Sequence, residues 1–125
     1  MRSALGVAGF CAVLLSACGP GPSESLPEKI KRAEAMRPSD PALAEKYERS
    51  CRICHINPDS GAPLTGDVAA WEPRLAQSKG ILAAHVRDGF NTMPPRGQCF
   101  DCTDDELQRL TDFMARRASK AEVAP

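Results

Sequence analysis

One cluster of residues has types and spacing that fit a specific chemistry: the pentapeptide Cys51–His55, which reads C-x-x-C-H. Two thiols three positions apart on one helical turn can both add to the vinyl groups of haem, and a histidine directly after them then faces the iron. The same residues are compatible with half a zinc site or with a thioredoxin-like dithiol. A zinc site lacks a convincing second ligand pair, and a dithiol should follow a strand, whereas residues 42–50 have a helical pattern. We therefore predict haem c attached at Cys51 and Cys54, with His55 as an axial iron ligand.

A second axial ligand is expected in the loop that contains Met93, which follows His55 by 38 positions. A thioether is a soft ligand that favours ferrous iron. Pro94 restricts Met93 to extended backbone, so the loop loses less conformational entropy when it holds sulfur on the iron. Three other residues are alternatives. Met36 lies in an expected tether, Met114 has a spacing typical of the core, and His85 lies in an expected helix. We predict Met93 as the sixth ligand.

Cys99 and Cys102 form a second C-x-x-C pair, in which Thr103 takes the place of the histidine. A second haem is therefore not expected. Outside the cytoplasm the default state of such a pair is a disulfide. It would close a loop of only four residues and clip the Met93 loop to the start of the last helix. A redox-active dithiol and a metal site are the alternatives.

The first residues have the features of an export signal. Residues 4–15 form an apolar stretch that is too short to span a bilayer. The segment Leu15-Ser16-Ala17-Cys18 resembles a bacterial lipobox, in which the cysteine thiol receives a diacylglycerol. We predict a signal peptide over 1–17 and a lipid anchor at Cys18, which puts the protein on the periplasmic side of a bacterial membrane. The alternative is an ordinary signal peptide cleaved near Ala17.

The rest of the chain divides into a tether, one domain and a tail. Residues 18–40 are rich in proline and poor in large apolar residues, which predicts a flexible tether, with a short helix around 26–37 as an option. The domain should cover 41–119 and the tail 120–125. The hydrophobic spacing predicts an all-α domain, with helices at about 42–54, 69–77, 81–88 and from Thr103 onward.

Two of these helices should cross beside the haem. The first places Leu43, Tyr47 and Cys51 four residues apart on one face. The last begins with a capping box of Thr103 and Glu106 and continues with an apolar stripe: Leu107, Leu110, Phe113 and Met114. We expect Tyr47 to pack near Leu110 and Phe113. Because a ligating histidine normally donates its other N–H to an oxygen, we predict that His55 donates to the carbonyl oxygen of Pro63.

Composition agrees with a domain built around something other than protein. Lys plus Arg and Asp plus Glu both total 16, so the zero net charge argues against non-specific nucleic-acid binding. Only six of the 125 residues are aromatic. That is little material for a core of this size, so either the domain is marginal or something other than protein fills its centre.

The sequence resembles the class I cytochromes c, and specifically the cytochrome c5 group. The residues that carry this resemblance are Tyr47, Cys51–His55, Gly61-Ala62-Pro63, Trp71-x-Pro73-Arg74, Gly89, Met93-Pro94-Pro95-x-Gly97, Cys99-x-x-Cys102 and Asp105-Glu106-Leu107. The resemblance implies about four short helices around one covalent haem, ligation by His55 and Met93, and a disulfide between Cys99 and Cys102. It also implies that Trp71 and Arg74 lie near the haem propionates.

The predicted function is electron transfer and not enzymatic catalysis. Six-coordinate iron leaves no open position for a substrate, so the iron would alternate between Fe(II) and Fe(III) while the haem edge passes electrons between redox partner proteins. Four arginines are expected to flank that edge and bind an acidic partner: Arg49, Arg52, Arg87 and Arg96. The alternatives are an accessory haem subunit of a respiratory or oxidase complex and a haem sensor or peroxidase-like enzyme with a labile sixth ligand.

Overall fold

The structure is a computed structural model that describes residues 24–116 and residue 122. The expected signal peptide, the lipobox cysteine and most of the expected tail lie outside the described residues. The described helices are α1 (Leu26–Ala35), α2 (Pro41–Lys46), α3 (Arg52–His55), α4 (Val68–Leu75), α5 (Lys79–Asp88) and α6 (Asp104–Ala115). Over the described ranges there is no sheet, and an isolated bridge between Phe90 and Met93 is the only strand-like pairing. The all-α prediction is confirmed.

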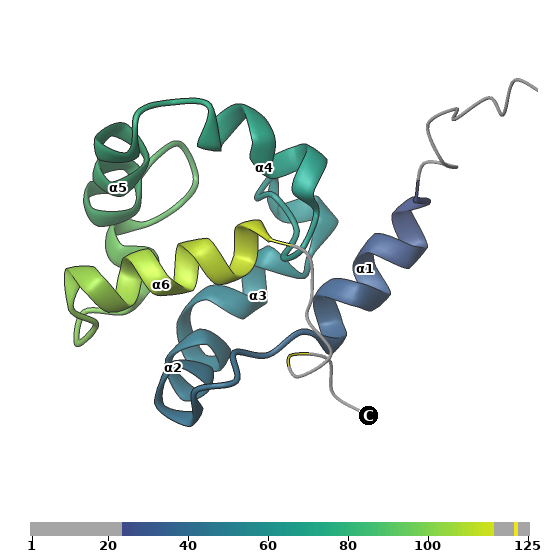
Figure 1. Cartoon of the computed structure of the whole chain (residues 1–125), viewed down its shortest axis with the longest axis horizontal. Coiled ribbons are helices and arrows are strands. Elements are labelled where there is room, and N and C mark those ends of the chain that lie inside the picture. The colour runs from purple at the N-terminus through teal and green to yellow at the C-terminus, as the bar shows by residue number, and fades with distance from the viewer. Residues whose placement is uncertain (1–23, 117–121, 123–125) are drawn as a thin grey trace, which may run out of the picture.

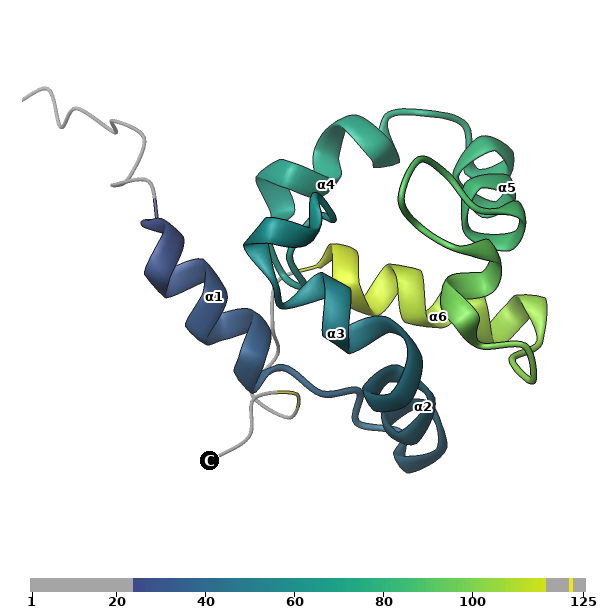
Figure 2. The ribbon, with the colours of Figure 1, turned by 180° about the vertical axis from the view of Figure 1, so that it is seen from behind.

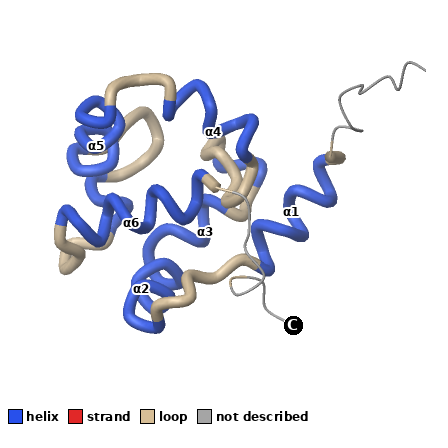
Figure 3. The backbone as a smooth tube through the Cα atoms, viewed as in Figure 1, coloured by secondary structure: helices blue, strands red, loops and turns tan. Residues whose placement is uncertain are grey.

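Helix α6 crosses the middle of the domain, with α2 and α3 on one side and α4 and α5 on the other (Figures 1 and 2). Two long loops connect α3 to α4 and α5 to α6, and these loops contain Pro63 and Met93, respectively (Figure 3). Within the part of the chain that the structure describes, no helix has the length and apolar character needed to cross a bilayer.

The helix expected at 42–54 is present but contains a turn that the sequence did not indicate. Between α2 and α3 the backbone forms a π-helical turn, η1 (Tyr47–Cys51), in which the N–H of Arg52 donates to the carbonyl oxygen of Tyr47. Single π turns often occur at functional sites, because they re-aim the residues that follow. Here the turn directly precedes the C-x-x-C-H motif. The expected inner face, Leu43, Tyr47 and Cys51, is buried as predicted.

Helix α6 forms as its sequence predicted. The hydroxyl of Thr103 accepts from the N–H of Glu106, and the Glu106 carboxylate accepts from the N–H of Thr103, which completes the capping box. The four residues of the predicted stripe are all buried. The rings of Tyr47 and Phe113 meet edge to face, with centroids 5.1 Å apart. The crossing of α6 with the helical segment that contains η1 is therefore fixed by an aromatic contact.

Within the expected tether, the structure has the short helix that was an option around residues 26–37. This segment forms α1 and its C-terminal cap, and both Ala33 and Met36 are 0% exposed. Met36 belongs to the buried core cluster. The inward-facing residues recur at helical spacing: Lys29, Arg32, Ala33 and Met36. Two of them are long charged side chains whose stems cover apolar surface, which is why a composition argument did not recognise the face.

Candidate haem-binding site

A cavity of about 680 Å³ lies between α3, α4, α5 and the two long loops. Its walls include all seven residues predicted to contact the cofactor: Cys51, Cys54, His55, Pro63, Trp71, Arg74 and Met93. These residues come from η1, α3, α4 and the two long loops, which together span 43 positions from Cys51 to Met93. Much of the remaining wall is apolar: Ile53, Leu82, Val86, Phe90, Pro94 and Met114. The domain therefore has a mostly apolar cavity at the position where a larger set of aromatic side chains would otherwise form the core.

The two cysteines of the motif present their thiols differently. Cys51 is buried and Cys54 is exposed. Burial, with a smaller contribution from Cys54, raises the pKa of the Cys51 thiol to about 11. Because both residues border the cavity, one helical turn offers two sulfur atoms to the same occupant.

His55 is held by contacts on both sides of its ring. Its Nδ1 lies 2.8 Å from the carbonyl oxygen of Pro63, and we assign the proton to Nδ1 because that oxygen can only accept. The ring stacks on Trp71 with centroids 5.6 Å apart and an interplanar angle of 20°. Burial lowers the pKa of His55, which favours the neutral imidazole. With Nδ1 donating, Nε2 carries the lone pair that a metal requires.

The Met93 loop is a tight turn that closes one side of the cavity. Phe90 and Met93 exchange two backbone hydrogen bonds, of 3.1 Å and 2.9 Å. Gly97 adopts φ +56°, and a Cβ built on it would lie 3.5 Å from Met93 Cε and 4.0 Å from Cys51 Sγ. The methionine side chain and the first cysteine of the motif therefore converge on the same glycine.

The alternative sixth ligands lie in different places. Met36 packs in the core and is not part of the cavity wall, whereas Met114 belongs to both. His85 borders the cavity and stacks on Phe90, with ring centroids 3.9 Å apart. Sequence reasoning missed this His85–Phe90 pair as part of the wall, because the two residues belong to different elements and their separation of five carries no helical signal.

Trp71 and Arg74 both border the cavity but use polar groups elsewhere. The single N–H of the Trp71 indole donates to the carbonyl oxygen of Leu64 at 3.0 Å. One guanidinium nitrogen of Arg74 donates to the carbonyl oxygen of Ala70 at 2.6 Å. Trp71 thus supplies an apolar surface rather than a hydrogen-bond donor, while Arg74 retains further N–H groups.

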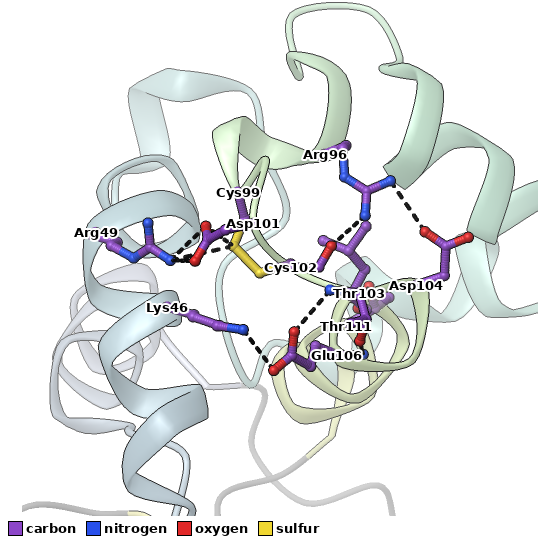
Figure 4. The surroundings of a disulfide bond; sticks show 11 residues. Lys46, Arg49, Arg96, Cys99, Asp101, Cys102, Thr103, Asp104, Glu106 and Thr111 are labelled. Atoms are coloured by element: carbon purple, nitrogen blue, oxygen red, sulfur yellow. Dashed lines mark hydrogen bonds and ion pairs between the residues drawn. A yellow bond between two sulfur atoms is a disulfide. The ribbon is translucent and has the colours of Figure 1, made fainter.

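Cys99 and Cys102 form a disulfide at the end of the Met93 loop (Figure 4). Both half-cystines are buried in the core cluster that includes Cys51. Arg49 of η1 forms an ion pair with Asp101, inside the disulfide loop, at 2.5 Å. Next to it, Lys46 and Glu106 form an ion pair of 2.6 Å between α2 and α6. The disulfide segment is thereby fastened to the helix that precedes the C-x-x-C-H motif.

The four arginines expected to bind an acidic partner each have a carboxylate partner within the chain. The pairs are Arg49–Asp101, Arg52–Glu48, Arg87–Asp88 and Arg96–Asp104. Their charges are therefore largely compensated locally. The structure gives no support to a positively charged docking surface made of these side chains.

The residues of the cavity fit haem better than a bare metal ion. Two thiols, an imidazole and a thioether, placed around a mostly apolar volume, are the donor set of a c-type haem site. Among the described residues there is no group of three or more His, Cys, Asp or Glu side chains arranged to hold a metal ion. The zinc alternative therefore finds no ligand set here.

Known proteins match this part of the chain. The sequence model of the family described as cytochrome c oxidase, cbb3-type, subunit III matches residues 38–114, more than half of the chain. Cytochrome c5 of Ectopseudomonas mendocina is 41% identical over 69 residues, which cover 54% of this chain and 79% of that protein. Cytochrome c5 of Azotobacter vinelandii is 45% identical over 67 residues (52% and 81%), and cytochrome c-555 of Chlorobaculum tepidum is 35% identical over 72 residues (54% and 67%).

The family match, over residues 38–114, covers the helices and loops that line the cavity. The predicted cofactor, covalent haem c, and the predicted class, electron transfer rather than catalysis, are both confirmed by this relationship. The chain belongs to the family of this model and is a single-haem class I cytochrome c, homologous to the cytochromes c5 and c-555.

Proposed function

We propose that Cys51 and Cys54 bind the haem covalently and that His55 and Met93 are its axial ligands. The observation that carries this proposal is that all four residues border the same mostly apolar cavity of about 680 Å³. They come from η1, α3 and the loop between α5 and α6. Bound there, haem supplies a one-electron Fe(II)/Fe(III) couple. The chain's own contribution is to hold its ligands in place and exclude water.

Each wall residue has a defined part in this arrangement. Pro63 fixes the His55 ring by accepting from Nδ1, and Trp71 supports the ring face. The two prolines after Met93 restrict the backbone that carries the thioether. Arg74 keeps guanidinium N–H groups for the acidic edge of the cofactor. Buried, well-fastened ligands reorganise little between the two iron oxidation states, which suits a carrier.

The experiment that tests the cofactor assignment is a pyridine haemochrome assay on mature protein exported under conditions that support haem attachment. We expect one c-type haem for each chain. The variant Cys51→Ala/Cys54→Ala should contain no covalent haem, whereas Cys99→Ala/Cys102→Ala should keep it. Mature wild-type protein that is folded and colourless would contradict the proposal.

We further propose that Cys18 is lipidated and anchors the carrier on the periplasmic side of a bacterial membrane. The support is the lipobox-like segment that ends at Cys18. Seven positions separate Cys18 from Ser25, the N-cap of α1. Such a segment spans at most about 25 Å, so the domain would stay close to the membrane and exchange electrons with partner proteins there.

The anchor is tested by cell fractionation of Cys18→Ser. We expect the wild type in the membrane fraction with the mass of a diacylated N-terminal cysteine, and the variant in the soluble periplasmic fraction. Equal partitioning of both proteins would exclude the anchor at Cys18. The haem content of the two proteins should be the same, because the substitution lies outside the domain.

A second candidate role is a haem subunit held in an oxidase complex. The observation that favours it is the family match, whose description names a subunit of cbb3-type cytochrome c oxidase. Purification after mild detergent extraction separates the two roles. Co-purification with oxidase subunits in constant ratio would favour the subunit, whereas isolation as a single chain would favour the mobile carrier.

A further inference from the structure

Helix α1 lies outside the matched family region, which begins at residue 38. Figure 2 shows it beside α3 and the loop that leads to α4. Its inner face consists of Lys29, Arg32, Ala33 and Met36, at the spacing i, i+3, i+4 and i+7. A helix that precedes the matched region and buries Ala33 and its C-cap residue Met36 completely needs an explanation of its own.

The inner face of α1 covers the loop that leads from α3 to α4. A Cβ built on Gly66, which adopts φ +80°, would lie 2.6 Å from Met36 Sδ and 3.0 Å from Arg32 Nε. Lys29 Nζ forms an ion pair of 3.0 Å with Asp67, the N-cap residue of α4. Gly66 thus allows the helix to touch the loop backbone, and Lys29 fastens the next residue.

The other side of the same loop holds His55. The carbonyl oxygen of Pro63 accepts from His55 Nδ1, and the N–H of Thr65 donates to the carbonyl oxygen of His55 at 2.8 Å. The hydroxyls of Thr65 and Tyr47 are 2.9 Å apart, and the N–H of Gly66 donates to Met114 at 2.7 Å. The loop therefore lies between α1 and the histidine.

Helix α1 also contacts the segment that carries the attachment motif. Arg52, between the two cysteines of that motif, donates to the carbonyl oxygen of Glu34 at 3.3 Å. Arg37, just after the helix, forms an ion pair with Glu48 of η1. Both partners of the His55–Pro63 hydrogen bond, the motif helix and the loop, are consequently held by one additional helix.

We infer that α1 positions the axial histidine: Met36 and Lys29 press the 63–67 loop against His55 and keep the Nδ1–H···O hydrogen bond short. This inference rests on the proposed role of His55 as an iron ligand. Donation from Nδ1–H raises the basicity of the imidazole, which stabilises Fe(III). Loosening the loop should therefore raise the midpoint potential. Met36 and Lys29 are positioning residues, since they act through the loop.

The first test compares Met36→Ala with Met36→Leu in the full-length holoprotein. The alanine variant removes the contact with Gly66, whereas leucine keeps most of its volume. We expect Met36→Ala to raise the reduced-to-oxidised ratio at a fixed potential by up to about tenfold, which is 59 mV for one electron. Met36→Leu should stay near the wild type. Amide exchange at Thr65 and Gly66 should accelerate only in the alanine variant.

The second test avoids a core cavity and uses the sign of the effect. Lys29→Gln removes a positive charge that pairs with Asp67, and Lys31→Gln removes one from the exposed face of the same helix. Loss of a positive charge by itself favours oxidised iron and lowers the potential. Both variants lose one positive charge, but only Lys29→Gln loses the ion pair with the loop. If α1 positions His55, the midpoint potential of Lys29→Gln is therefore higher than that of Lys31→Gln, and its amide exchange at Thr65 is faster.

The amide of Leu107 in α6, which donates to the carbonyl oxygen of Thr103, is the reference position outside the 63–67 loop. Faster amide exchange at Thr65 in Met36→Ala or Lys29→Gln without a rise in midpoint potential would overturn the inference. Equally faster amide exchange at Thr65 and Leu107 with an unchanged midpoint potential would also overturn it. In both cases α1 contributes only stability. A wild-type protein without a c-type haem spectrum would contradict the proposed function instead, so the two failures are distinguishable.

Discussion

Two buried side chains near the cavity, His55 and Tyr47, have environments that favour one protonation state each. Burial lowers the pKa of His55 and favours the neutral imidazole, while the Pro63 carbonyl accepts from Nδ1 and so places the proton on that nitrogen. Burial also raises the pKa of Tyr47, so its hydroxyl stays protonated and shares a hydrogen bond with Thr65. Such fixed protonation states are compatible with a site that passes electrons without moving protons.

Met93→Ala tests the sixth ligand at this scale. We expect loss of the long-wavelength sulfur-to-iron charge-transfer band, a lower midpoint potential and rapid CO binding to the reduced protein, because the soft thioether no longer occupies the iron. His85→Ala is the matched control, since His85 borders the same cavity. Survival of the band in Met93→Ala would move the thioether ligand to another methionine, such as Met114 of the cavity wall, whereas a wild-type protein without the band would favour His85 as the sixth ligand.

Tyr47→Phe tests the buried hydroxyl pair. Removing one hydroxyl leaves the 0% exposed Thr65 without this partner, so the free energy of unfolding should fall by about 1–3 kcal/mol in urea denaturation. The double variant Tyr47→Phe/Thr65→Val removes both groups and should lie closer to the wild type than Tyr47→Phe. Additive losses in the double variant would mean that the two hydroxyls act independently.

At the scale of elements, the loop from α5 to α6 is shaped by its turn residues. Gly89 ends α5 with φ +91°, and Asn91 and Arg96 adopt φ +52° and +58° in the same loop. Positive φ is costly for side chains other than glycine, so the loop adopts this shape only because its neighbours hold it there. These include the ion pair of Arg96 with Asp104, the hydrogen bond of Arg96 with the Cys102 carbonyl and the disulfide.

Gly89→Ala tests how far this shape determines ligation. The new Cβ would meet Met93 O at 3.0 Å and Pro95 N at 3.1 Å, in a backbone conformation that alanine disfavours. We expect the free energy of unfolding to fall by at least about 1–2 kcal/mol and the charge-transfer band to weaken. Gly61→Ala, at φ +73° with no described atom within 4 Å of the new Cβ, should show the first effect without the second.

At the scale of the whole molecule, ion pairs connect the front of the domain to its last helix and to the disulfide loop before it. Arg109 pairs with Asp40, Lys46 with Glu106, and Arg49 with Asp101. In each case the hydrogen bond from the basic partner lowers the pKa of the carboxyl group from its ordinary value. The Arg109–Asp40 and Arg49–Asp101 pairs are exposed, so they respond to salt as well as to pH, whereas the Lys46–Glu106 pair is partly buried.

The pH dependence of unfolding follows from these lowered pKa values. The unfolded chain binds protons first, near the ordinary values of 3.8 for Asp and 4.5 for Glu, so the stabilisation is complete above that range. It is lost as the pH falls through the lower folded values. In urea denaturation, the free energy of unfolding of the wild type should exceed that of Asp101→Asn at neutral pH. This difference should become smaller below about pH 4, and it should also become smaller in high salt. The exposed Asp59→Asn serves as the control, and a difference that grows on acidification would contradict the assignment.

The sequence by itself determined what depends on local spacing. The C-x-x-C-H motif, the capping box at Thr103 and the periodicity of the helices from 42 to 115 all express interactions between near neighbours, and the structure has the helices where they were expected. The link between His55 and Pro63 was also accessible, because it spans only eight positions and a ligating histidine requires an acceptor.

Only the tertiary structure decided which distant residues meet. The π turn η1 leaves the hydrophobic spacing of 43, 47 and 51 unchanged, so periodicity does not reveal it. The inner face of α1 has a charged composition typical of a tether, and its burial depends on Gly66 and Asp67, some 30 positions further on. The pairing of Arg49 with Asp101, 52 positions further on, likewise depends on packing between elements. Contacts of this kind form when folding brings distant segments together and closes the loops between them. The residue pattern within one segment does not predict which other segment it will contact.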